Sequence, residues 1–270
     1  MPIPFRATPE CPSGSRRIAE ELLARGFVTT AAADRSDLEL TCTTQGLALR
    51  AETDAGPMLT LSIDLGGGSR GYRQARAARS REDLVRALGR LPRGSTILDA
   101  SAGLGRDAMV LAAWGFDVVA LERHPILAAL LADAMERADR DQALQTAIGR
   151  IDLQQGNARE WLSRHRRVFD AAVFDPMFPP RRKDAQVKKE MRVLHRLLGA
   201  DADTDAPETL ASLLAHVRRC VVVKRPLHAP WLGDLKPARS LRGRSTRFDV
   251  YLPRAPEGAV GPAFEAERAL

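Results

Sequence analysis

Short apolar stretches alternate with helical segments in the second part of the chain, and this alternation limits the possible folds more than any other feature. The apolar stretches read TILDA, DVVALE, IDLQQ, DAAVFD and CVVVKRP. Helical periodicity predicts helices near residues 106–114, 125–139, 159–165, 184–198 and 207–218. Parallel strands need a crossover connection, usually a helix, so the pattern predicts an α/β fold with a doubly wound, mostly parallel sheet. The last apolar stretch, RFDVYLP, is predicted to form an edge or hairpin strand.

Residues 1–80 follow a different pattern. Residues 1–35 read as a loose segment with one short helix around RRIAEELLARG, whereas residues 38–64 alternate apolar and polar side chains between turn signals at TQG and DAG. This alternation predicts a small antiparallel meander. We therefore expect a small N-terminal β-rich subdomain with a basic connector (1–80), an α/β domain (81–255) and a frayed tail (256–270).

Composition and charge narrow the class of protein. Of the 270 residues, 44% are hydrophobic and 28% charged, as in globular proteins, and no stretch approaches the roughly 20 apolar residues of a membrane helix. The start of the chain lacks the apolar core of a signal peptide, which predicts a cytoplasmic protein. The net charge of +7 favours a polyanionic partner such as RNA or DNA, although genome composition can also produce an arginine excess.

The cysteines argue against two kinds of cross-link. Cys11, Cys42 and Cys220 are odd in number and widely spaced, which predicts neither a disulfide framework nor a structural zinc site. No cluster of histidine, cysteine and aspartate suggests a metal, so none is expected. A cysteine nucleophile is also disfavoured, because Cys220 begins a strand.

A glycine-rich loop follows the first strand of the α/β part, in the sequence ILDASAGLGRDA. Asp99 ends the strand, and Gly103 and Gly105 lie in the loop before the next helix. Ligands bind at the carboxyl ends of the strands in α/β sheets, and glycines there let the backbone approach a ligand. The ammonium and sulfonium groups of S-adenosylmethionine (SAM) suit Asp99, whereas a pyrophosphate would be repelled. Helix capping is the alternative role for Asp99, and the Gly103–Gly105–Ala108 spacing also matches dinucleotide binders.

Other strand ends supply further cofactor candidates. Glu122 closes the second strand, where a carboxylate accepts hydrogen bonds from ribose hydroxyls, in NAD enzymes as well. Arg106 and Asp107 follow the glycines, and Asp107 also suits the positive end of the helix dipole. Asn157 and Ala158 end the third strand segment, beside the expected adenine ring, although a simple turn explains Asn157 nearly as well.

The fourth strand ends in DPMFPP, which places Asp175 by the reactive end of a cofactor. An exocyclic base amine is a poor nucleophile, because its lone pair is delocalised into the ring. A carboxylate and a backbone carbonyl that accept its N–H bonds aim the lone pair at the methyl group. Phe178 would stack on the base, and Pro176 and its neighbouring prolines stiffen the loop. The catalytic candidates are therefore Asp175, Pro176 and Phe178, with inward packing as the alternative for Phe178.

Basic residues gather after this loop. Val187, Met191, Leu194 and Leu198 give the next helix one apolar stripe, and its opposite side is basic. A solvated face is the usual meaning of such charge, but this face starts beside the predicted base pocket and favours a phosphate track. The RNA-binding candidates are Arg181, Arg182, Lys183, Lys188, Lys189, Arg192 and, at the end of the fifth strand, Lys224 and Arg225.

Together these motifs resemble the RsmJ-type methyltransferases of bacterial small-subunit ribosomal RNA. The matching stretches are LDASAGLGRDA, LERHPILAALLADA, DPMFPPRRKDAQVKKEMRVLHRLLGADAD, VVVKRP and RFDVY, in family order. The resemblance implies a class I, Rossmann-like SAM-dependent methyltransferase that modifies N2 of a guanine in 16S rRNA, free or in the small subunit. It also implies cofactor contacts from Arg106, Asp107, Glu122, Arg123, Asn157, Ala158 and Asp175.

Three alternatives remain open from the sequence. A strand-ending D-P-x-F loop also suits methylation of adenine N6 in RNA or DNA, which analysis of the methylated nucleoside would distinguish. An NAD-dependent oxidoreductase would use the glycine spacing but leaves DPMFPP unexplained. A non-catalytic RNA-binding protein of the same fold would retain RNA without turnover.

Overall fold

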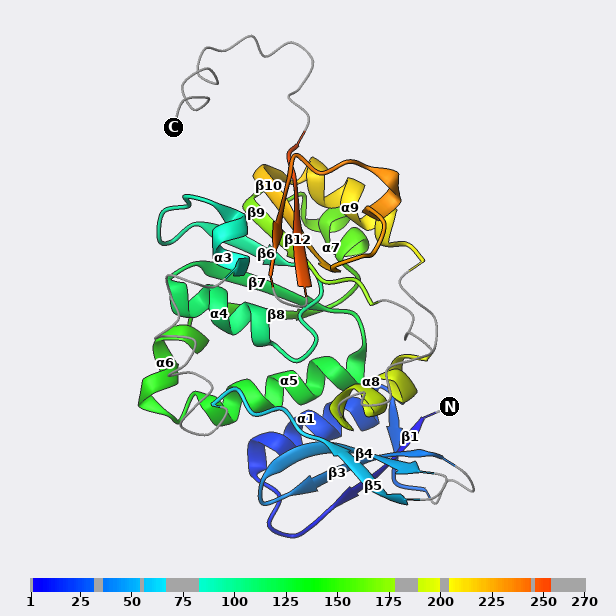
Figure 1. The fold of residues 1–270 in the computed structure, drawn as a ribbon. Helices are drawn as coiled ribbons and strands as arrows, with labels where there is room; N and C mark the ends of the chain where they lie inside the picture. The colour runs from blue at the N-terminus through cyan, green and yellow to red at the C-terminus, as the bar shows by residue number, and fades with distance from the viewer. Residues whose placement is uncertain are drawn as a thin grey trace.

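The structure, a computed structural model, describes residues 2–31, 36–53, 56–66, 83–177, 189–199, 204–243 and 246–253. Within these ranges the chain forms two β-sheets, with helices packed around and between them (Figure 1). The basic connector, Phe178 and the predicted tail lie outside the described residues.

The larger sheet confirms the doubly wound fold. Its strands are Thr96–Asp99 (β6), Asp117–Glu122 (β7), Ile151–Gln155 (β8), Phe169–Phe174 (β9), Val217–Pro226 (β10), Arg239–Arg242 (β11) and Thr246–Tyr251 (β12). The strand order is β11-β12-β10-β9-β6-β7-β8. Strands β6 to β10 are parallel, whereas β12 is antiparallel to both β10 and β11. The chain therefore reverses its direction of winding between β6 and β9, and RFDVYLP forms an inner hairpin strand.

Helices cover both faces of this sheet. One face carries Asp83–Leu88 (α3), Arg106–Trp114 (α4), Pro125–Ala138 (α5) and Gln142–Ile148 (α6), and the other carries Ala158–His165 (α7) and Ala206–Ala215 (α9). Successive strand residues point to opposite faces, so Ile97 joins the first core and Leu98 the second. The short α6 was not predicted; Asp141 caps it by accepting a hydrogen bond from the Ala143 N–H. No described helix is both long and apolar enough to cross a membrane.

The smaller sheet contains more strands than the sequence predicts. They are Ile3–Ala7 (β1), Val28–Thr29 (β2), Leu38–Thr43 (β3), Gly46–Thr53 (β4) and Gly56–Leu61 (β5), in the order β2-β1-β3-β4-β5. The predicted meander is present as β3 to β5. The prediction of a loose segment over residues 1–35 is wrong, because β1 pairs in parallel with β2 and β3. The helix Ser13–Ala24 (α1) connects β1 to β2. The partners of β1 are distant in sequence, so local alternation does not reveal them.

A buried carboxylate fixes the smaller sheet against α5, which lies with α1 between the two sheets (Figure 1). Asp133 is 1% exposed, accepts a hydrogen bond from the Leu47 N–H at 3.1 Å and pairs with Arg137 Nε at 2.9 Å. Arg137 also donates to the Ile63 carbonyl at 2.8 Å. One apolar cluster runs through both sheets, so they share a continuous core.

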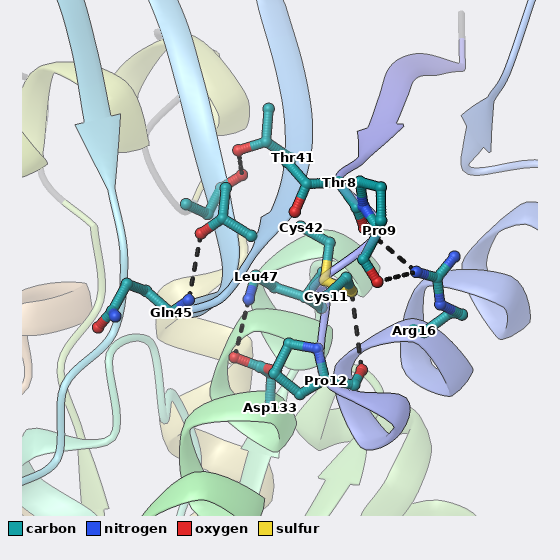
Figure 2. The surroundings of a disulfide bond; sticks show 12 residues. Thr8, Pro9, Cys11, Pro12, Arg16, Thr41, Cys42, Gln45, Leu47 and Asp133 are labelled. Atoms are coloured by element: carbon teal, nitrogen blue, oxygen red, sulfur yellow. Dashed lines mark hydrogen bonds between the residues drawn. A yellow bond between two sulfur atoms is a disulfide. The ribbon is translucent and has the colours of Figure 1, made fainter.

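The structure corrects the expectation that no cysteines pair. Cys11 and Cys42 form a disulfide with their Cα atoms 5.4 Å apart. Figure 2 shows this bond between the loop before α1 and β3, close to the contact of Asp133 with Leu47. The two cysteines meet because β1 lies beside β3, which their spacing of 31 residues does not indicate. Cys220 is a buried free thiol.

Candidate active site

A cavity of about 300 Å³ opens at the carboxyl ends of the parallel strands, beside the switch in strand order. Ligands bind at this position in open α/β sheets. Most of the predicted cofactor residues line it: Gly103, Arg106, Asp107, Glu122, Arg123, Asn157, Ala158 and Asp175. Asp99 and Gly105 are buried and do not line the cavity. The structure thus brings together side chains from separate strand ends, as the sequence predicts.

The glycine loop is held in place by Glu122. Gly103 and Gly105 have φ angles of +53° and +74°, a region that disfavours other residues, and a Cβ at Gly105 would lie 2.5 Å from Leu131 Cδ1. Glu122 is buried and accepts hydrogen bonds from the N–H groups of Gly103 at 2.9 Å and His124 at 2.7 Å. The Glu122 carboxylate therefore ties the loop to the end of β7.

Asp99 lies beneath the loop. It is 2% exposed, and its Oδ1 accepts a hydrogen bond from the Ser101 N–H at 3.1 Å. Burial raises the pKa of Asp99 to about 8, and the Asp107 and Asp175 carboxylates add to the rise. The predicted attraction between an ionised Asp99 and a cationic ligand therefore requires loss of this proton. Among the described residues, the carboxylates that line the cavity are Asp107, Glu122, Asp175 and Asp205.

Replacing Asp99 by asparagine should raise the free energy of unfolding, and the gain should grow with pH. Because the pKa of Asp99 is raised from 3.8 to about 8, the folded protein keeps a proton that the unfolded chain loses, and stability falls between these pH values. Asparagine does not ionise, so its advantage should increase by up to about 4 kcal/mol between pH 5 and pH 8. Urea unfolding of both proteins at these two pH values measures the difference; an equal gain at both would contradict the assignment.

Lys224 anchors the side chain of Asp175 at the cavity. Asp175 follows β9, and its backbone N–H donates to Ser101 Oγ at 2.8 Å. Its Oδ2 lies 2.9 Å from Lys224 Nζ, which is also 3.1 Å from Asp107 Oδ2. Pro176 is buried and Met177 lines the cavity. Ser101 was not predicted as a site residue, since a serine in a small-residue loop carries no distinguishing signal.

Lys224 and Arg225 do not lie together on a basic surface. Lys224 lines the cavity, whereas Arg225 is 4% exposed and donates to the Pro230 carbonyl at 2.5 Å. Consecutive strand residues point to opposite faces, so only one of the two can reach the cavity. The burial of Arg225 contradicts its predicted place on an RNA-binding surface.

Asn157 caps helix α7, a role that was not predicted for it, since the alternative considered from the sequence was a simple turn. Its side-chain oxygen accepts hydrogen bonds from the N–H groups of Arg159 at 2.9 Å and Glu160 at 3.5 Å, at the start of α7. On the same wall, Arg123 and Arg159 lie 3.8 and 3.9 Å from the Asp205 carboxylate before α9. Asn157 and Asp205 both line the cavity, so the starts of α7 and α9 form part of its wall.

An amphipathic helix forms an apolar wall of the cavity. The described part of this helix is Lys189–Leu198 (α8), within the predicted helix at 184–198. Met191, Leu194 and Leu198 of the predicted stripe line the cavity, while Val193 is also buried and the helix packs against β5 (Figure 1). Arg192 is exposed. The other basic candidates before it, Arg181, Arg182, Lys183 and Lys188, lie outside the described residues, as does the side chain of Lys189.

The strand order, the place of the cavity and the carboxylates around its glycine loop define a class I SAM-dependent methyltransferase. The sequence model of a family described as "Putative SAM-dependent methyltransferase" matches residues 23–253. The chain belongs to this family, together with relatives named "Ribosomal RNA small subunit methyltransferase J".

Two relatives and one solved structure illustrate the match. The relative from Thioalkalivibrio sulfidiphilus is 48% identical over 209 residues, which cover 76% of this chain and 80% of the relative. That from Pseudomonas aeruginosa is 38% identical over 260 residues, 93% of each chain. A SAM-dependent methyltransferase from Neisseria gonorrhoeae has a TM-score of 0.72 and 29% identity, covering 96% of this chain and 100% of that one. These matches confirm the predicted family, fold class and cofactor, and the NAD-dependent alternative is wrong.

The residues of the cavity suit SAM. Glu122 ends β7, the position from which a carboxylate reaches ribose hydroxyls. Asp107 and Asp175 bring negative charge to the cavity, which suits a cationic ligand, and α8 supplies an apolar wall. The lining therefore offers groups that match the charged, polar and apolar parts of the cofactor.

Proposed function

We propose that the protein methylates the exocyclic N2 amine of a guanine in small-subunit 16S ribosomal RNA, in the cytoplasm. The observation that carries the proposal is the position of Asp175, whose side chain follows β9 at the cavity and pairs with Lys224 at 2.9 Å. The relatives are named for methylation of small-subunit ribosomal RNA. The choice of guanine N2 comes from the resemblance to the RsmJ-type enzymes.

The chemistry follows from the weakness of the amine as a nucleophile. SAM, when bound, supplies a methyl group on a positively charged sulfur. Asp175 accepts one N–H bond of the amine and the Pro176 carbonyl accepts the other, which directs the nitrogen lone pair towards the methyl group. After transfer the nitrogen carries one proton too many, and we assign the Asp175 carboxylate as the base that receives it. The buried ring of Pro176 restricts the backbone at this point.

We assign RNA contacts to the residues that follow the catalytic loop. Phe178 would stack on the target base, and the basic side chains after it would contact phosphates. The exposed Arg192 and the net charge of +7 support this assignment, because α8 carries Arg192 next to the Met191 that lines the cavity. The proposed phosphate contacts are Arg181, Arg182, Lys183, Lys188, Lys189 and Arg192.

Transfer of labelled methyl groups from SAM to small ribosomal subunits that lack the modification tests the function. We expect label in the 16S rRNA, recovered as N2-methylguanosine after digestion to nucleosides. N6-methyladenosine would instead identify an adenine methyltransferase. Retention of RNA without label would identify a non-catalytic binding protein. Naked 16S rRNA in a parallel reaction shows whether the assembled subunit is required.

A further inference from the structure

Lys224 holds a position that the methyl-transfer chemistry alone does not require. Its ammonium nitrogen is 3.1 Å from Asp107 Oδ2 and 2.9 Å from Asp175 Oδ2. Asp107 belongs to the first turn of α4, Asp175 follows β9, and Lys224 lies in β10. Three elements that are distant in sequence therefore meet at one nitrogen atom, beside the proposed catalytic carboxylate.

The ammonium group keeps one donor for a ligand. A lysine has three N–H donors, and within the described part of the chain two of them face Asp107 and Asp175. The side chain lines the cavity and is 32% exposed. Its third N–H can therefore donate to an acceptor on a molecule bound next to Asp175.

The group is also reliably charged. Burial alone lowers the pKa of Lys224, but the carboxylates of Asp107 and Asp175 outweigh this effect and raise the pKa above its ordinary value. A positive donor that is held between two carboxylates and cannot easily move favours an oxygen acceptor and disfavours an amine at the same place. Lys224 therefore requires that a ligand bound beside Asp175 present an oxygen acceptor, and not an amine, towards the ammonium group.

Guanine matches the pair formed by Asp175 and Lys224. Its N2 amine and N1–H are neighbouring donors, and O6 follows as an acceptor on the same edge. A carboxylate has acceptor sites for two parallel N–H donors in addition to its contact with lysine. Adenine presents an unprotonated N1 and an amine at C6, so it would set an acceptor against the carboxylate and a donor against the ammonium.

We propose that Lys224 is a specificity-determining residue, which donates a hydrogen bond to O6 of the target guanine while Asp175 accepts from N1–H and N2–H. This inference rests on the proposed function, because it concerns the base that enters the same cavity. Asp107 also pairs with the ammonium, and this second ion pair would help to hold Lys224 in position for the contact with the base.

A single replacement at the target base tests the contact. In one 16S rRNA the target carries guanine; in another, 2,6-diaminopurine, which keeps the N2 amine, replaces O6 by an amine and lacks the N1 proton. The ratio of the two kcat/KM values is measured for the wild type, Lys224→Met and Lys224→Gln. Lys236→Met, which removes an exposed lysine, is the matched control for loss of one positive charge. If naked RNA is inactive, both RNAs are assembled into subunits.

We expect the wild type to prefer guanine by about a hundredfold or more, because the analogue leaves polar groups of the site unpaired. Lys224→Met and Lys224→Gln should each reduce this preference by about tenfold or more, and Lys236→Met should leave it unchanged. The ratio does not depend on the fraction of correctly folded enzyme, since both substrates meet the same preparation. Equal losses on both substrates, with the ratio intact, would overturn the inference and leave Lys224 only a role in holding Asp175.

The proposed function and the assignment of the O6 contact to Lys224 can be disproved separately. If the wild type transfers no methyl group to guanine in small-subunit RNA, the proposed function is wrong. If it does so while the Lys224 variants keep the wild-type ratio, only the assignment of the O6 contact is wrong.

Discussion

Replacement of Asp175 by alanine should lower the rate of methyl transfer by about a thousandfold or more. The variant loses the carboxylate proposed to orient the amine and to receive its proton, while Glu122 and the glycine loop remain to hold SAM. Single-turnover transfer from labelled SAM to small subunits measures the loss. Calorimetric titration with SAM measures cofactor binding, which should persist.

A matched control removes a carboxylate far from the cavity. Asp117 begins β7 and pairs with Arg150 at 2.6 Å on the surface, so Asp117→Ala should transfer methyl groups at the wild-type rate. If Asp175→Ala kept a rate within tenfold of the wild type, the catalytic loop would be misassigned. If it lost both activity and SAM binding, Asp175 would act chiefly through the cofactor.

Replacement of Asp249 by alanine should reduce the free energy of unfolding by about 3–5 kcal/mol. Asp249 is fully buried in β12 and accepts hydrogen bonds from Arg247 Nε at 2.8 Å and Nη2 at 2.7 Å. Arg247 also donates to the carbonyls of Leu227 and Ala229, just after β10. Without Asp249 the buried guanidinium loses its counter-charge, so both the hairpin and the segment after Lys224 lose support.

Denaturant unfolding, followed by circular dichroism, measures this effect. Asp117→Ala again serves as the control, because its ion pair with Arg150 is partly exposed and should contribute at most about 1 kcal/mol. A loss at Asp249 no larger than the loss at Asp117 would mean that the buried pair contributes little to stability.

Periodicity and strand ends were sufficient to predict the α/β fold and most of the cavity wall. Apolar runs mark the buried strands, and the carboxyl ends of parallel strands share one edge, which is why Glu122 and Asp175 could be placed together in advance. Contacts between distant segments were not accessible in this way. The Cys11–Cys42 pair depends on β1 lying beside β3, and nothing local in the sequence encodes that pairing.

The sequence also could not separate Lys224 from Arg225, which are adjacent, basic and equally suited to RNA. Their roles differ because a strand directs one to the cavity and the other into the protein. Similarly, the apolar stripe of α8 was evident, but the sequence did not say that it would form a cavity wall while the helix also packs against β5.

The position of helix α8 couples cofactor binding to the docking of this helix on the smaller sheet. The helix is the wall of the cofactor cavity on one side and a support of the smaller sheet on the other. Any free energy by which bound SAM stabilises the position of this helix would also strengthen the docking of the helix on the sheet, and linkage requires the reverse effect to be equal. Substitutions on β5, which packs against α8 and supplies none of the lining residues of the cavity, should therefore alter cofactor affinity from a distance.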